Sequence, residues 1–181
     1  MPKLSYLEAI QQGLDQAMEK DDDVFVLGED VGKKGGVFGV TLGLQQKYGE
    51  ARVLDTPLAE SNIVGTSIGA AMLGKRPVAE IQFAEYILPA TNQIMSEAAK
   101  MRYRSNNDFY CPITIRSPFG GGIHGALYHS QSVESIFANT PGLTIVIPST
   151  PYDAKGLLLA SIESNDPVLY FEHKKAYRLL K

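Results

Sequence analysis

Short apolar segments and helical segments alternate along this chain, and this alternation constrains the fold more than any other feature. The apolar segments are near-continuous and rich in β-branched residues, which is typical of strands that are covered on both faces. They lie at residues 24–27, 52–55, 77–81, 112–116, 144–147 and 168–171. Strands that alternate with helices predict a parallel sheet with helices on both faces. The expected fold class is therefore α/β, with a parallel sheet of about six strands.

Helical patterns fill most of the intervals between the expected strands. We expect an amphipathic helix over residues 5–20, because Ser5 and Glu8 have the spacing of a capping box. The other helices are expected at residues 42–48, 63–73, 90–104, 132–138 and 152–164. Gly49 and Gly74 are expected to cap two of these helices at their carboxyl ends. No repeat or linker divides the chain, so we expect a single domain over residues 1–181.

Composition narrows the class of protein. The net charge of −3 is too small to indicate binding to nucleic acid or to an acidic membrane surface. Cys111 is the only cysteine, so no internal disulfide can form and a reducing compartment is expected. Residues 1–10 lack the basic start and apolar run of a signal peptide. No apolar stretch approaches the roughly 18 residues that span a bilayer. These features predict a cytoplasmic globular protein.

Polar, aromatic and glycine-rich residues follow four of the expected strands. The four segments are 28–30, 55–60, 82–86 and 117–131, and the last contains three consecutive glycines and two histidines. In open parallel sheets, ligands bind beyond the carboxyl ends of the strands. We therefore expect the four segments to meet at one edge of the sheet, where their carboxylates, aromatic rings and imidazoles form a candidate site.

Each of these residues also has a purely structural interpretation. Glu60 is favourable as an acid in the first turn of a helix, and Phe83 and Tyr86 would suit a hydrophobic core. His124 and His129 have no cysteine or carboxylate within a few residues, so a metal site is not expected there.

Two glycine-rich segments have the appearance of phosphate-binding loops. Residues 120–125 match the spacing G-x-G-x-x-G after a strand, but no acid ends the next expected strand, as a dinucleotide-binding unit requires. Residues 32–39 lack the Lys-Ser/Thr ending of a P-loop. We interpret residues 120–125 as a mobile loop.

The segment 55–61 (DTPLAES), followed by a helix rich in Gly, Ala and Ile, resembles the pyrimidine-binding motif of one enzyme family. This family comprises the beta subunits of thiamine-diphosphate-dependent 2-oxo acid dehydrogenases. Further segments match the family in the same order, and the resemblance runs essentially from residue 4 to residue 178. These segments are 28–32 (GEDVG), 35–38 (GGVF), 79–83 (AEIQF), 102–105 (RYRS) and 148–157 (PSTPYDAKGL). The resemblance implies a thiamine-diphosphate-binding fold with the pyrimidine domain represented here.

The resemblance implies roles for five residues. Glu60 would be the carboxylate that hydrogen-bonds a pyrimidine nitrogen and favours the imino tautomer that activates the cofactor. Tyr86, and with it Phe83, would pack against the pyrimidine ring. Leu58 and Gln82 would line the same pocket.

His129 corresponds to the catalytic histidine of the family, which would act when the acyl group is passed to a lipoyl disulfide. The segment 124–131 (HGALYHSQ) is similar to the branched-chain members, whereas pyruvate-specific relatives often carry an acid where Gln131 stands. The resemblance therefore implies oxidative decarboxylation of branched-chain 2-oxo acids, such as 2-oxoisovalerate, and acyl transfer to a lipoyl acyltransferase core.

The resemblance also implies a partner subunit. The chain has no Gly-Asp-Gly followed by paired asparagines, the motif that binds Mg²⁺ and the diphosphate. In this family the alpha subunit supplies that motif, so thiamine diphosphate would be shared within an α2β2 heterotetramer. The family's second α/β domain would follow the strand ending at Phe171, so we expect this chain to be a fragment.

A structural potassium ion is common in the family. The positions that match its ligands are Ile113, Ser161 and Asp166, although the family often has asparagine where Asp166 stands.

Three alternatives stay open on sequence alone. The first is a pyruvate dehydrogenase beta subunit or a transketolase-like relative that uses the same cofactor. The second is a catalytically inert fragment or interaction module with the same fold. The third is a dinucleotide-binding domain, which rests on the glycine spacing at residues 120–125.

Overall fold

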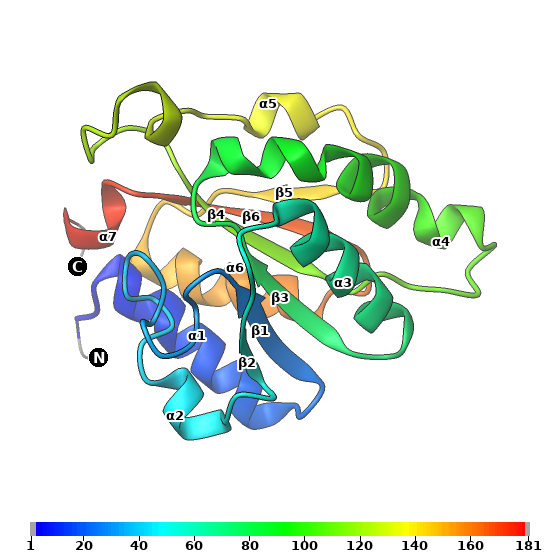
Figure 1. Ribbon diagram of the computed structural model, residues 1–181, viewed down its shortest axis with the longest axis horizontal. Coiled ribbons are helices and arrows are strands. Elements are labelled where there is room, and N and C mark those ends of the chain that lie inside the picture. Colours follow the sequence, from blue (N-terminus) through cyan, green and yellow to red (C-terminus); the bar gives the residue numbers. More distant parts are fainter. Residues whose placement is uncertain (1–2, 180–181) are drawn as a thin grey trace.

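The computed structural model describes residues 3–179, and it confirms the α/β class predicted from the sequence (Figure 1). One sheet contains six strands in the order β2-β1-β3-β4-β6-β5, and every pairing is parallel. The strands are β1 Val24–Gly28, β2 Val53–Asp55, β3 Arg76–Glu80, β4 Thr114–Phe119, β5 Thr144–Val146 and β6 Val168–His173. Each strand overlaps one of the six apolar segments of the sequence.

Helices cover both faces of this sheet (Figure 1). The α-helices are α1 Tyr6–Lys20, α2 Leu44–Tyr48, α3 Glu60–Met72, α4 Met101–Arg104, α5 Glu134–Phe137, α6 Pro151–Glu163 and α7 Ala176–Leu179. On one face, α1 and α6 surround a core that includes Leu14 and Leu158. On the other face, α3 and the helical turns after β3 enclose a second core that includes Ile63 and Ile87. None of the helices in residues 3–179 combines the length and apolar character needed to cross a membrane.

Local capping chemistry fixes the ends of the helices as the sequence predicts. The Ser5 hydroxyl accepts a hydrogen bond from the Glu8 N–H, and the Glu8 carboxylate accepts one from the Ser5 N–H, so the predicted capping box is present. Gly49 caps α2, as predicted. Gly74 lies one residue beyond the cap of α3 with a φ of 90°, a conformation that glycine adopts without strain.

The predicted helix over residues 90–104 is wrong as a continuous α-helix. The structure instead has a 3₁₀-helix η1 at Ala84–Ala90, a π-turn η2 at Gln93–Glu97, a 3₁₀-turn η3 at Ala98–Lys100 and then the short α4. Pro89 lies inside η1 and has no N–H to donate, so a regular helical ladder is interrupted there. In η2 the Ala98 N–H reaches back to the Gln93 carbonyl, and such π-turns are common near functional sites.

The order of the strands places the candidate site. The chain passes from β1 to β2 on one side and then to β3 on the other side of β1, so Gly28 at the end of β1 lies between Asp55 of β2 and Glu80 of β3. This change of direction is a topological switch point, and open α/β sheets bind ligands beyond the carboxyl ends of the strands at such a point, here β1 and β3. The loops that follow β1, β2 and β3 therefore border one site.

Candidate functional site

Hydrogen bonds hold the loops after β1, β2 and β3 together at this edge of the sheet. The Thr56 N–H donates to the Gly28 carbonyl at 2.9 Å, and the Gly32 N–H donates to Asp55 Oδ1 at 2.6 Å. The third loop joins them through Gln82, which was predicted as a site residue and donates from Nε2 to the Glu29 carbonyl at 3.2 Å. The loops are thus positioned by one another as well as by the strands.

Glu60 lies at this edge as the first residue of α3. It is half-buried, and within residues 3–179 its carboxylate receives no hydrogen bond and makes no ion pair. Burial raises the pKa of the neighbouring Glu29, and the negative charges of Asp30 and Glu60 act in the same direction. Unlike Gln82, Leu58 is 71% exposed. The result is an acidic edge of the sheet with the Glu60 carboxylate in the first turn of a helix.

Three predicted side chains form an aromatic cluster at the same edge of the sheet. Phe83 and Tyr86 meet edge to face with ring centroids 5.8 Å apart. His129, which reaches them from the loop after β4, lies edge to face with Phe83 at 4.4 Å and with Tyr86 at 5.7 Å. Such edge-to-face contacts fix the relative orientation of the rings. The structure therefore brings together residues that are more than forty positions apart in the sequence.

Two hydrogen bonds set the proton pattern of the His129 ring. Its Nδ1 lies 3.1 Å from the Gly125 carbonyl, which can only accept, so Nδ1 carries the proton. Its Nε2 is then the acceptor for the Tyr86 hydroxyl, 3.4 Å away. A residue with a side chain would not fit in place of Gly125, because its Cβ would lie 2.5 Å from the His129 Cβ. The ring consequently presents a basic nitrogen toward Tyr86.

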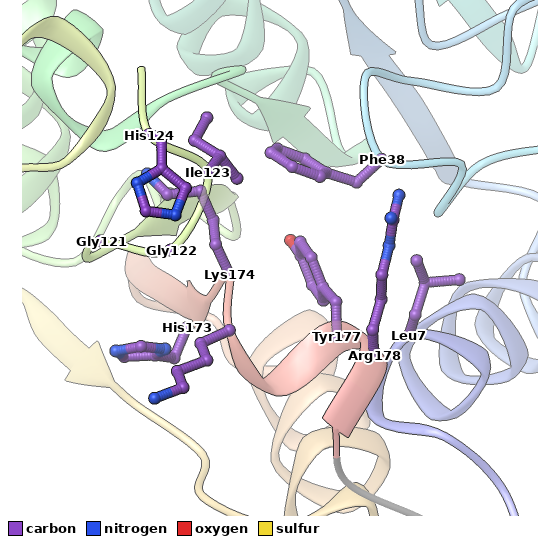
Figure 2. A pocket seen from close by; sticks show the side chains of 11 residues that line it. Leu7, Phe38, Gly121, Gly122, Ile123, His124, His173, Lys174, Tyr177 and Arg178 are labelled. Carbon is purple, nitrogen blue, oxygen red and sulfur yellow. The ribbon is translucent and has the colours of Figure 1, made fainter. Parts of the chain in front are cut away.

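The second histidine of this loop has a different environment. His124 is exposed and has a φ of 56°, in the left-handed region. It lines a cavity of about 880 Å³ in which Ile123 and His124 stand opposite Tyr177 and Arg178 of α7 (Figure 2).

The residues that line this cavity include neither Glu60 nor His129. After Gly125 the chain makes only the four-residue 3₁₀-turn η4, Ala126–His129. A dinucleotide-binding loop would open a longer helix at this point.

The three positions that the resemblance connects with potassium lie near the amino ends of β4 and β6. The Ile113 carbonyl already accepts a hydrogen bond from Val168, at 2.9 Å. Asp166 Oδ2 lies 2.6 Å from the guanidinium of Arg102, which balances its charge. The Ser161 hydroxyl donates to the Leu157 carbonyl within α6. The potassium site stays a prediction.

The sequence analysis missed a buried ionic network at the same edge. Arg116 in β4 is 1% exposed and donates to Glu80 Oε2 at 2.7 Å and to both carboxylate oxygens of Glu172, at 2.6 and 2.8 Å. Tyr177 also donates to Glu172. The signal was available, because Glu80 and Arg116 have opposite charges and both fall inside expected apolar strands. The network ties the carboxyl ends of β3, β4 and β6 together.

The fold agrees with that of a solved transketolase structure. The structure superposes on a solved structure described as "Split gene transketolase, inactive beta4 tetramer" with a TM-score of 0.73. The match covers 94% of this chain and 51% of that chain at 19% sequence identity, so it establishes the shared fold alone.

Sequence comparison then gives the family. Residues 2–179 match the family described as "Transketolase, pyrimidine binding domain", and the chain belongs to this family. The resemblance found in the sequence is thereby confirmed at the level of the domain.

Curated relatives extend the comparison. The chain is 67% identical to the 2-oxoisovalerate dehydrogenase subunit beta of Bacillus subtilis, over 100% of this chain and 55% of that protein. It is 54% identical to the pyruvate dehydrogenase E1 component subunit beta of Acholeplasma laidlawii, over 98% of this chain and 54% of that protein. It is 53% identical to the 2-oxoisovalerate dehydrogenase subunit beta of Pseudomonas aeruginosa, over 96% and 50%. The chain thus spans about half the length of these relatives.

Proposed function

We propose that the chain is the pyrimidine-binding part of the beta subunit of a branched-chain 2-oxo acid dehydrogenase. In this role it decarboxylates 2-oxo acids together with an alpha subunit and passes the acyl group to the lipoyl group of an acyltransferase core. The observation that carries the proposal is the half-buried Glu60 carboxylate, which has no hydrogen bond or ion pair within residues 3–179, at the same edge of the sheet as the cluster of Phe83, Tyr86 and His129. The family match and the names of the relatives support it.

The residues fit thiamine diphosphate by the chemistry of their donor set. A half-buried carboxylate without a donor of its own suits a ligand that offers a protonated ring nitrogen. Glu60 would accept that hydrogen bond, while Tyr86 and Phe83 would pack their rings against the pyrimidine and Gln82 and Leu58 would border it. When bound, thiamine diphosphate supplies a carbon nucleophile and an electron sink for the decarboxylation. The contribution of Glu60 is to hold a proton at the ring nitrogen.

His129 would serve the later acyl transfer. Its Nε2 is the unprotonated nitrogen and already accepts from the Tyr86 hydroxyl. An imidazole in this state can take a proton from the transferred group or return one to the lipoyl sulfur.

The proposal includes a shared site. The sequence has no motif for Mg²⁺ and the diphosphate, so we infer that an alpha subunit holds both. The exposed Leu58 is consistent with a surface that a partner covers.

The substrate is the finer part of the proposal. Residues 124–131 favour branched-chain 2-oxo acids, and 67% identity to a 2-oxoisovalerate dehydrogenase subunit favours the same class. A pyruvate dehydrogenase is the second candidate, because a subunit of that name is 54% identical. Initial rates of the reconstituted enzyme on 2-oxoisovalerate and on pyruvate decide between them. A higher kcat/KM on pyruvate would overturn the branched-chain assignment.

Glu60→Gln in the full-length protein, assembled with its alpha subunit, tests the role of Glu60. The glutamine amide keeps the shape of the side chain but cannot hold the proton at the pyrimidine nitrogen. The rate of decarboxylation, measured with an artificial electron acceptor, should therefore fall by about 10²–10⁴-fold. Glu50→Gln is the matched control, because Glu50 is an exposed glutamate away from the site, and it should leave the rate unchanged. A loss below about tenfold for Glu60→Gln would contradict the proposal.

His129→Ala tests the second step in the same enzyme. It should impair reductive acylation of a lipoyl domain more than turnover with the artificial acceptor. Equal loss in both assays would assign His129 to substrate binding or decarboxylation instead.

A further inference from the structure

One peptide group next to His129 is held at both ends by buried charges. The ammonium of Lys174 donates to the His129 carbonyl at 2.8 Å. The N–H of the same peptide group, which belongs to Ser130, donates to Glu85 Oε1 at 2.9 Å. Lys174 is 5% exposed and Glu85 is 6% exposed. A cation therefore faces the carbonyl end of this peptide dipole and an anion faces its N–H end.

Glu85 and Lys174 lie in segments that follow two different strands. Glu85 follows β3 in η1, and Lys174 follows β6 on the segment that leads into α7, below the glycine-rich loop (Figure 2). The salt bridges found in residues 3–179 do not pair Lys174 with Glu85, so the peptide group connects them instead. The loop after β4 is thereby attached to β3 and to β6 through the residue that carries the imidazole.

The attachment matters because the turn η4, which leads into this peptide group, is exposed. The turn η4 that ends at His129 contains no buried residue, and Leu127 and Tyr128 in it are exposed. Ala126 has a φ of 56°, which costs free energy for a residue with a side chain. Apart from the ring contacts of His129 with Phe83 and Tyr86, packing therefore contributes little to the position of this turn, so polar bonds to its backbone add to its order.

Burying a charged side chain costs free energy, so the burial of both Lys174 and Glu85 indicates a specific role for them. Burial lowers the pKa of Lys174, and the carboxylate of Glu85 acts in the opposite direction. Glu85 Oε2 is buried and has no hydrogen-bond partner within the described chain. The ammonium of Lys174 also lies 5.3 Å from the centre of the Phe83 ring, which itself contacts His129. Hydrogen bonds to charged groups are stronger than neutral ones, so two of them on one peptide hold it firmly.

We propose that Glu85 and Lys174 are positioning residues that fix the His129 imidazole against Phe83 and Tyr86 by clamping the peptide between His129 and Ser130. This inference rests on the function proposed for His129 and extends it to two residues that touch neither substrate nor cofactor. Both side chains act on one peptide group, so loss of either should release the same turn.

Lys174→Met and Glu85→Met in the full-length enzyme with its alpha subunit test the clamp. Each should lower the rate of reductive acylation by about 10–100-fold, because a displacement of about 1 Å has consequences of that order. KM for the 2-oxo acid should change less than about threefold, since binding precedes the step that uses His129. Lys175→Met is the control. Lys175 is the exposed neighbour of Lys174, and its replacement should leave the rate of acylation unchanged.

Two further variants separate positioning from a general loss of structure. Glu85→Gln keeps an oxygen that accepts from Ser130, so it should retain activity within about fivefold. The double variant Glu85→Met with Lys174→Met should lose no more than the worse single variant, because both act through one peptide. Losses that multiply, or a Glu85→Gln variant as impaired as Glu85→Met, would overturn the clamp.

Amide exchange of Ser130 and the His129→Ala variant keep this test independent of the proposed function. If His129→Ala impairs acylation while Lys174→Met and Glu85→Met do not, the clamp is refuted and the function stands. If His129→Ala has no effect, the function proposed for His129 fails, and the clamp is then judged by exchange alone. Lys174→Met should make the Ser130 amide exchange at least about tenfold faster, as expected for a locally opened segment. Unchanged exchange would refute the clamp.

Discussion

Replacing Arg116 by methionine should cost far more stability than the loss of an ordinary ion pair. The guanidinium is 1% exposed and makes three charge-assisted hydrogen bonds of 2.6 to 2.8 Å to Glu80 and Glu172. Methionine fills much of the same space but leaves both carboxylates buried without their cation. Breaking one buried ion pair typically costs about 3–5 kcal/mol of stability. Because Arg116→Met leaves two buried carboxylates without a cation, we expect a cost near the upper end of that range, about 5 kcal/mol.

The assay is urea unfolding of the purified chain at pH 7 and at pH 5, with Arg104→Met as the control. Arg104 lies 2.7 Å from Glu97, and both side chains reach water, with 53% and 39% of their surface exposed, so its loss should cost about 0–1 kcal/mol. Comparing the stability lost in Arg116→Met and in Arg104→Met separates the effect of burial from the effect of an ion pair alone.

The pH dependence gives the reasoning a second test. Burial raises the pKa of Glu80 above its ordinary value of 4.5, and Arg116 opposes that rise. Without Arg116 the folded-state pKa moves further up, so the variant is most destabilised above that pKa and recovers as Glu80 is protonated. The deficit of Arg116→Met should therefore shrink from pH 7 to pH 5. A cost below about 1 kcal/mol, or a cost equal at both pH values, would refute this account.

Three further outcomes are expected. Gly125→Ala should displace His129 and lower reductive acylation by at least about tenfold, because the new Cβ would lie 2.5 Å from the His129 Cβ; an unchanged rate would show that the loop moves freely. Ser5→Ala removes the capping hydroxyl that accepts from Glu8, and it should lower the unfolding free energy by about 1 kcal/mol in urea titration. Glu29 has a raised pKa in the folded state, so its contribution to stability is present below the ordinary value of 4.5 and is lost as pH rises through the folded value. Glu29→Gln should flatten the stability profile over that window, and an unchanged profile would exclude Glu29 as its source.

Much of the fold follows from local chemistry that a sequence displays directly. The capping box of Ser5 and Glu8 and the glycine at position 49 act within a few residues, so their consequences can be read without knowing the tertiary structure. The rule for parallel sheets then places Glu60 and Tyr86 at one edge, since it depends only on which segments follow strands.

The features that were missed depend on long-range contacts. The break in the helix after β3 arises where η1 packs against α3, and Ser61 binds the Pro89 carbonyl at 2.6 Å, a contact that no local period reveals. The clamp on His129 joins Glu85 and Lys174 across eighty-nine positions of sequence, and each residue alone resembles an ordinary surface charge. Charges buried by tertiary structure are therefore the part of such a site that sequence periodicity does not locate.

The place of β6 in the sheet has a consequence for the order in which the protein folds. Within residues 3–179, β5 pairs with β6 alone, and β6 in turn pairs with β4, so β5 gains its neighbour only after the strand that follows it has been made. During synthesis on a ribosome, the first four strands can pair with one another before β5 has a partner strand. The arrival of residues 168–173 then inserts one strand between β4 and β5 and brings Glu172 to Arg116. A nascent chain arrested between β5 and β6 would expose the edge of β4, whose backbone groups are then open to pairing with another strand.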